Sequence, residues 1–360
     1  MRSNQFRILF AGDTSFGENY QLKYVKEGGQ NILEKMGYDH PFEKLKPILL
    51  QSDVVVVNLE TPITNRLKSP IPVQTKKNFH WTDVEKAPLY FKKYNMKIFS
   101  LANNHVLDYG PDGLEQTLDI LRKNEMQWIG AGSNRAEARK PYIQELAIGT
   151  QTFRLAVISG FEYRKVYDQD FVFYANSKVG GVNRISVKKF AKQIKKLKES
   201  MSGVYIVVFP HWGRNYTWKS AKQSRLAHEI VDAGADLIIG HGSHTMQEIE
   251  KYNGRWILYG IGNFMFNPGG RFQKFNADPF GLAAQLLLHE DNGKLVKTMK
   301  LYPILTDNKV TNYQARFVTL DEFERVRKLL LEKSLQTAEL EKEIRTGKDE
   351  MGYFMEYNLE

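Results

Sequence analysis

Short apolar runs rich in β-branched residues recur along most of the chain, and each stops abruptly at a glycine or a polar residue. Runs of this length without polar alternation are typical of strands in a sheet that is covered on both faces. Strands are therefore expected at residues 6–11, 53–59, 97–101, 153–159, 204–209, 237–240 and 256–259. The pattern predicts an α/β protein.

Between these runs lie segments in which apolar residues recur every three or four positions, the spacing of one helix face. The helices are expected at 114–124, 187–199 and 221–233. A charged segment at 320–346 has heptad-like apolar positions and predicts a helix that packs on the body of the molecule or on a partner. We expect a main domain of residues 1–318 followed by a helical extension at 319–360.

The composition narrows the class of protein. The chain has 360 residues, of which 42% are hydrophobic and 26% charged, as in ordinary globular proteins. It has no apolar run of about 18 residues, so no membrane-spanning helix is predicted. Arg7 and Asp13 leave no room for a secretory signal, and a cytoplasmic location is expected. The absence of cysteine excludes disulfides, thiolate nucleophiles and cysteine-based zinc sites.

Positive charge is concentrated in one predicted helix. The chain carries 51 Lys+Arg against 41 Asp+Glu, a net charge of +10, and segment 187–199 alone holds six lysines. Such a face either binds an anionic polymer, a phosphate or lipid headgroups, or is an ordinary solvated surface. The chain lacks the motifs of nucleic-acid-binding domains, so the expected partner is an anionic small molecule or polymer. The sequence leaves the oligomeric state open.

Carboxylate, amide and imidazole side chains follow the ends of the predicted strands. In α/β sheets these ends are where ligands bind. The residues are Asp13, Glu60, Asn104, His105, His211, His241 and His244. Carboxylates and imidazoles are the ligands that zinc, manganese and iron prefer, so the sequence predicts a divalent metal site. The other histidines are interpreted as structural; they are His40, His80, His228 and His289.

The same residues lie in an ordered series of motifs. The series comprises Gly12-Asp13, Asn58-Leu59-Glu60-Thr61-Pro62, Leu101-Ala102-Asn103-Asn104-His105, His211-Trp212-Gly213, Gly240-His241-Gly242-Ser243-His244 and Gly262-Asn263-Phe264. It resembles the bacterial capsule-synthesis protein CapA family, which acts in poly-γ-glutamate synthesis and belongs to the calcineurin-like metallophosphatase superfamily. The resemblance implies a four-layer α/β/β/α sandwich with metals at the strand ends.

The resemblance also implies a role for each residue. One metal site would have a complete ligand set of Glu60, Asn104, His211 and His241, and a second would have the smaller set of Asp13, Glu60 and His244. His105 would donate a proton to the leaving group, with His244 as a further catalytic candidate. Arg214 is the candidate clamp for an anionic substrate, because its planar donors suit phosphate or carboxylate.

Three functions are compatible with these residues. The first is a metal-dependent hydrolase of a phosphoester or an anionic poly-γ-glutamate-like polymer in capsule or envelope synthesis. The second is a non-catalytic accessory protein that binds polymer or a synthase, and the third is a metal-dependent peptide epimerase. The aromatic connection at 161–181 is expected to form a lid or a wall of the substrate site.

Overall fold

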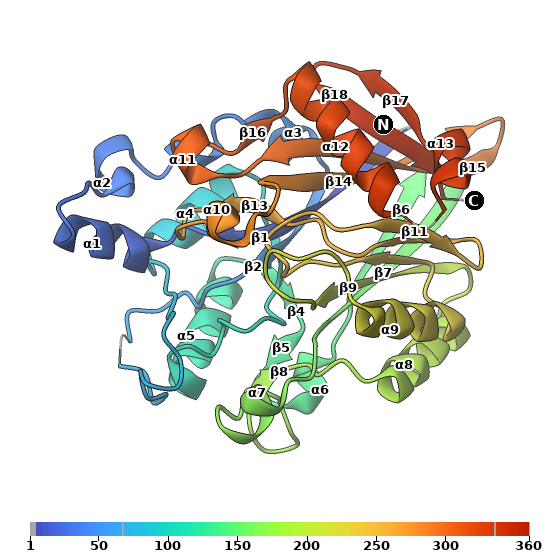
Figure 1. The fold of residues 1–360 in the computed structure, drawn as a ribbon. Coiled ribbons are helices and arrows are strands. Elements are labelled where there is room, and N and C mark those ends of the chain that lie inside the picture. Colours follow the sequence, from blue (N-terminus) through green and yellow to red (C-terminus); the bar gives the residue numbers. More distant parts are fainter. Residues whose placement is uncertain (1–4, 67, 335, 360) are drawn as a thin grey trace.

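Two β-sheets packed face to face form the centre of the molecule in a computed structural model (Figure 1). The structure describes residues 5–66, 68–334 and 336–359. Helices cover the outer face of each sheet, so the layers follow the order α/β/β/α. The four-layer sandwich that the sequence predicts is confirmed.

The larger sheet runs in the order β17-β18-β15-β14-β1-β2-β3-β4, with β13 added beside β1 and β16 beside β15. Its strands are β1 (Gln5–Ser15), β2 (Val54–Leu59), β3 (Ile98–Ser100), β4 (Gln127–Ile129), β13 (Asn263–Phe266), β14 (Phe280–Asp291), β15 (Lys294–Leu305), β16 (Arg316–Phe317), β17 (Arg345–Lys348) and β18 (Tyr353–Asn358). Strands β1 to β4 are parallel, whereas β14, β15 and β18 are antiparallel.

The smaller sheet runs in the order β11-β12-β10-β9-β7-β6. Its strands are β6 (Tyr142–Ile148), β7 (Gln151–Phe161), β9 (Val204–His211), β10 (Leu237–Ile239), β11 (Ile249–Tyr252) and β12 (Arg255–Leu258). Strands β7, β9, β10 and β12 are parallel, so their carboxyl ends lie at one edge. A separate short pair joins β5 (Ala131–Gly132) to β8 (Gly181–Val182).

Alternation along the central strands explains why both faces of each sheet are buried. Successive side chains of a strand point to opposite faces. In β1, Ile8 and Phe10 pack in the core between the sheets, whereas Leu9 packs under the outer helices. In β9, Val207 faces the same central core and Val208 faces the helices on the other side. The strands are apolar throughout because both of their faces are covered.

The helices follow from amphipathic segments that close these outer cores. Helices α3, α4 and α5 cover the larger sheet, and α8 and α9 cover the smaller one. The longer helices and those near the strand ends are α1 (Glu18–Lys26), α3 (Lys46–Gln51), α4 (Lys86–Lys93), α5 (Gly110–Lys123), α6 (Arg135–Ala138), α7 (Lys165–Gln169), α8 (Val187–Ser200), α9 (Ala221–Asp232), α12 (Leu320–Lys333) and α13 (Thr337–Glu343). The short helices are α2 (Ile32–Met36), α10 (Phe272–Phe275), α11 (Asn308–Thr311) and the 3-10 turn His40–Phe42.

The carboxyl-terminal region differs from the predicted helical extension. Helices α12 and α13 do form, and Phe323, Val326 and Leu330 pack against the central core. The chain then turns into β17 and β18, and β18 pairs with β15 in the larger sheet. The last segment is therefore a structural part of the sandwich, because the exposed edge of β15 offers backbone donors and acceptors that another strand can satisfy.

Strand β1 changes its pairing partner near its carboxyl end, where the polar residues of the site begin. Up to Phe10, β1 pairs with β14; from Asp13 onward it pairs with β13 instead. Gly12 lies at the change, where a Cβ atom would stand 1.8 Å from the carbonyl oxygen of Gly262. The absence of a side chain therefore lets two backbones approach closely at the end of the central strand.

Across the described residues, no helix combines the length and the apolar character needed to cross a bilayer.

Candidate metal centre

The ends of the parallel strands from both sheets meet at one edge of the sandwich. Asp13 lies in β1 in register with Asn58 of β2 on one side and Asn263 of β13 on the other. From the smaller sheet, His211 ends β9 and His241 follows β10, and the two are joined by a parallel backbone bridge. The edge therefore collects carboxylates from one sheet and imidazoles from the other.

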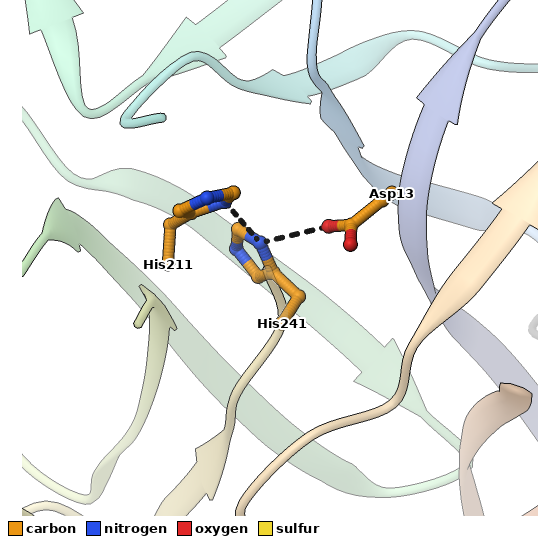
Figure 2. A group of neighbouring side chains, drawn as sticks. All are labelled: Asp13, His211 and His241. Carbon is orange, nitrogen blue, oxygen red and sulfur yellow. Dashed lines mark hydrogen bonds and ion pairs between the residues drawn. The ribbon is translucent and has the colours of Figure 1, made fainter. Parts of the chain in front are cut away.

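The first ligand group comprises Asp13, His211 and His241, whose side chains point toward one another (Figure 2). The His241 Nδ1 atom lies 3.5 Å from Asp13 Oδ1 and 3.2 Å from His211 Nδ1. Asn58 donates from Nδ2 to Asp13 Oδ1 over 2.9 Å, which fixes the carboxylate. All three members of the group are buried.

The second group comprises Asp13, Glu60 and His244. The His244 Nδ1 atom lies 3.2 Å from Asp13 Oδ2, and His244 Nε2 lies 3.9 Å from Glu60 Oε1. His244 adopts a left-handed backbone with φ of 60°, an unusual conformation for a residue with a side chain. Asn263 contacts its Nδ1 through Oδ1 over 2.9 Å. Asp13 belongs to both groups and thus occupies the position between them.

Several polar atoms of these groups lack hydrogen bonds within the described part of the chain. They are Asp13 Oδ2, both carboxylate oxygens of Glu60 and the Nε2 atom of His241, all of them buried. A buried polar atom without a partner costs about 1–3 kcal/mol, and more when it is charged. Buried carboxylate oxygens without hydrogen-bond donors, such as those of Glu60, are expected of metal ligands. The two groups are therefore compatible with divalent metal ions.

The electrostatics of the groups lead to the same conclusion. Burial and the neighbouring Asp13 raise the pKa of Glu60 well above its usual value. Burial also acts to raise the pKa of Asp13, but hydrogen bonds with His241 and His244 outweigh it and hold that pKa well below the usual range. Burial lowers the pKa of His211 and keeps its imidazole neutral. A divalent cation would favour ionised carboxylates beside neutral imidazoles, so it would relieve the repulsion within this cluster.

His105 lies beside the second group and is held by a separate buried carboxylate. Its Nε2 lies 4.0 Å from Glu60 Oε1, while its Nδ1 contacts Asp108 Oδ2 over 2.7 Å. Asp108 is buried and paired with the ammonium of Lys76, which also donates to the Asn104 carbonyl over 2.5 Å. Since Asp108 occupies Nδ1, the Nε2 atom is the one presented to the metal centre.

His80, which the sequence interprets as structural, packs directly against His105. Its ring stacks on that of His105 with centroids 3.6 Å apart and 11° between the planes. Its Nδ1 contacts the backbone oxygen of Glu60 over 3.2 Å, and its backbone N–H donates to Asp108 over 2.6 Å. No strand end or motif marks His80, so its position was not visible in the sequence. Asp108 could have been found from the sequence, because it follows His105 by three residues and contacts its ring.

The remaining predicted residues lie at the rim. Asn104 is half-buried in the loop after β3, and its part in a metal site stays a prediction. Arg214 is exposed in the loop after β9, and its role as an anion clamp also stays a prediction. After burial and His241, the charge of Arg164 is among the causes that lower the pKa of His211. Arg164 donates to the Gly213 carbonyl, so this cation, which the sequence did not single out, lies beside the first group.

The aromatic connection after β7 forms a wall next to His211. Phe173 and Tyr174 are buried there with Phe161, whose ring lies 5.5 Å from that of His211. The Lys76 ammonium lies 5.1 Å from the centre of the Phe173 ring. These contacts show a packed boundary between the metal centre and the outer part of the segment.

One family of known proteins matches most of this chain. The family described as "Bacterial capsule synthesis protein PGA_cap" matches residues 7–268, a region that contains all the ligand candidates above. The chain belongs to this PGA_cap family. The motif resemblance to capsule-synthesis proteins is therefore confirmed.

Individual relatives share about 31% of their aligned residues with this chain. The PGA biosynthesis protein CapA of Bacillus subtilis (strain 168) is 31% identical over 261 residues, which cover 72% of this chain and 63% of that protein. A Mycobacterium tuberculosis protein (strain H37Rv) named "Probable polyglutamine synthesis accessory protein" is 31% identical over 222 residues, covering 59% and 55%. This PGA_cap chain thus matches only about 55–63% of the length of these relatives.

Among solved structures, the calcineurin-like phosphoesterase YfkN from Bacillus subtilis is similar to this chain with a TM-score of 0.49 and 13% identity. The similarity covers 86% of this chain and 95% of that one.

Proposed function

We propose that this PGA_cap protein is a metal-dependent hydrolase that acts on a phosphoester or on an anionic poly-γ-glutamate-like polymer in capsule or envelope synthesis. The observation that carries the proposal is the pair of buried ligand groups that share Asp13, with the Nε2 atom of His105 facing the second group. A site for binding alone would not require a proton-transfer group held by a buried carboxylate.

In the proposed mechanism each residue has one task. Asp13 would be a ligand of both metals, with His211 and His241 on one side and Glu60 and His244 on the other. Bound divalent ions would supply Lewis acidity at the scissile group and lower the pKa of an attacking water. His105 would pass a proton from Nε2 to the leaving group, while Asp108 holds its Nδ1.

The test measures metal content and turnover together. Purified protein, loaded separately with manganese, zinc and iron, is assayed on a chromogenic phosphodiester and on γ-linked glutamate oligomers. Asp13→Asn should lose metal and turnover, whereas His228→Gln should keep both, because His228 pairs with Glu250 of β11 and belongs to neither ligand group.

Each other outcome selects a different function. Retained metal and polymer binding without turnover would indicate an accessory protein, and solvent deuterium incorporation without cleavage would indicate an epimerase. Absence of metal from the wild-type protein after loading would overturn the metal centre itself.

A further inference from the structure

A polar cavity lies outside the metal centre, near α6, α7 and β8, three elements that Figure 1 labels. It has a volume of about 200 Å³ and is lined by four cations: Arg135, Arg139, Arg184 and Lys189. One carboxylate, that of Asp168, is also part of its lining. We call this feature the basic cavity.

The four cations of the basic cavity form no ion pairs within the described residues, although the Arg184 guanidinium lies over the Tyr163 ring, 3.8 Å from its centroid. Within the described ranges, none of the four has a carboxylate within 4.0 Å of its side-chain nitrogens, although many other arginines and lysines of this chain do. Burial and Arg135 lower the pKa of Arg139, and burial with both of these arginines lowers the pKa of Lys189. Like charges therefore converge here, at a cost that an anion would remove.

The start of α8 adds to this positive field. Ser186, the residue that precedes the helix, makes no capping hydrogen bond through its side chain, and the first turn contains no acidic residue. A helix amino terminus carries a partial positive charge and is stabilised by anions rather than by lysines. Lys189 nevertheless lies in this first turn, so the local sequence increases the positive charge instead of balancing it.

The basic cavity shares a wall with the metal centre. Tyr174 lines the cavity, and its hydroxyl donates to the Glu162 carbonyl over 2.6 Å. Its ring lies 5.9 Å from that of Phe161, which in turn contacts His211 on the other side. The side chains of Tyr174 and Phe161 therefore lie between the cavity and His211, and a ligand long enough to reach past them could occupy both sites.

We propose that the basic cavity is a subsite that binds carboxylates of an acidic polymer whose reacting part lies at the metal centre. Its cations are exposed or half-buried, and each such contact contributes only about 0.2–1 kcal/mol. Useful affinity therefore requires several charges on one ligand, which a polymer with an acid on every residue supplies. The identity of the polymer rests on the proposed function, whereas the anion subsite does not.

The test compares two double variants with the same change in charge. Arg139→Gln with Arg184→Gln removes two cations of the basic cavity, and Lys195→Gln with Lys196→Gln removes two exposed cations elsewhere on α8. A fluorescent γ-linked glutamate decamer is titrated against each by anisotropy at physiological salt. The cavity variant should bind about tenfold more weakly, and the α8 variant less than about twofold more weakly than wild type. Thermal unfolding of both variants confirms that they fold.

Each further outcome has a defined meaning. Equal losses in the two variants, or none in either, would overturn the subsite. Inorganic phosphate is added as a competitor of the labelled decamer. If millimolar phosphate displaces it as effectively as unlabelled decamer does, the cavity is a site for a single anion and the polymer assignment is overturned. The cavity variant should keep wild-type turnover of a small chromogenic phosphodiester. Decamer binding that depends on the cavity, without any wild-type turnover, would refute the hydrolase and leave the subsite standing.

Discussion

Replacing Glu18 with glutamine should change how the stability of the protein depends on pH. Glu18 begins α1 and is 5% exposed, and its carboxylate accepts hydrogen bonds from Thr82 Oγ1 over 2.8 Å and the Asp83 N–H over 3.0 Å. Burial raises the pKa of this carboxyl from 4.5 to about 7, because those hydrogen bonds offset only part of the lost hydration.

The sign of the effect follows from linkage. Because the pKa is higher in the folded state, the protonated side chain favours folding at low pH. This contribution is fully present below about pH 4.5 and is lost as the pH rises to about 7. A rise from 4.5 to about 7 corresponds to about 3 kcal/mol in the free energy of unfolding. Glu18→Gln removes the ionisable group, so its stability relative to wild type should increase by about that amount from pH 4.5 to pH 8.

Urea unfolding at several pH values between 4.5 and 8 measures this difference. Metal-free protein is used throughout, so that ligand protonation at the metal centre affects wild type and variant equally. Glu34→Gln, an exposed change on α2, is the control and should follow the wild-type curve. If the curves of Glu18→Gln and wild type run parallel over the whole range, the reasoning is refuted, because Glu18 then ionises in the folded protein as it does in the unfolded chain.

Three further predictions concern the metal centre. His105→Ala should keep its metal and lose about 10² to 10⁴ in rate on a phosphodiester with a poor leaving group, but much less on one with a good leaving group; equal losses would make His105 a ligand or positioning group. Asp108→Asn should show the same dependence on the leaving group with a smaller loss, and a uniform loss on both substrates would speak against it. Gly242→Ala should lower the metal content measured by elemental analysis, since its Cβ would lie 2.7 Å from the ring of His211 at a φ of 98°; unchanged content would contradict this.

The strand ends were predictable because each apolar run ends abruptly at a glycine or a polar residue. Every predicted strand is present, and five of the polar residues after them lie in the two ligand groups: Asp13, Glu60, His211, His241 and His244. The division of the ligands was not predictable. The resemblance implied that Glu60 shares a site with His211 and His241, and that assignment stays a prediction; the structure groups those histidines with Asp13. Motif order reveals which residues reach the edge, but the distance between two packed sheets decides which of them meet.

Other elements of the fold were not predicted from the sequence, although one of them has a clear sequence signal. The long hairpin of β14 and β15 turns at Asn292-Gly293, both with positive φ, which is the residue pair that two-residue hairpin turns favour. That signal was available. Strand β17 offers no such cue, because its residues are mostly exposed and it forms only by pairing with β18. His80 reaches His105 through a loop of irregular structure, for which no periodicity exists.

Asp13 belongs to both ligand groups, and its partners lie far along the chain. This separation affects when the site can form during synthesis on the ribosome. Asp13 and Glu60 emerge from the ribosome well before His241 and His244, since His241 lies 228 residues after Asp13. The neighbour of β1 on its other side, β14, comes later still. Contacts between such distant parts of a chain form slowly, because the intervening loop must first be closed. A nascent chain therefore carries two acidic side chains without their partners until this long stretch has been made, and metal capture should follow the folding of both sheets.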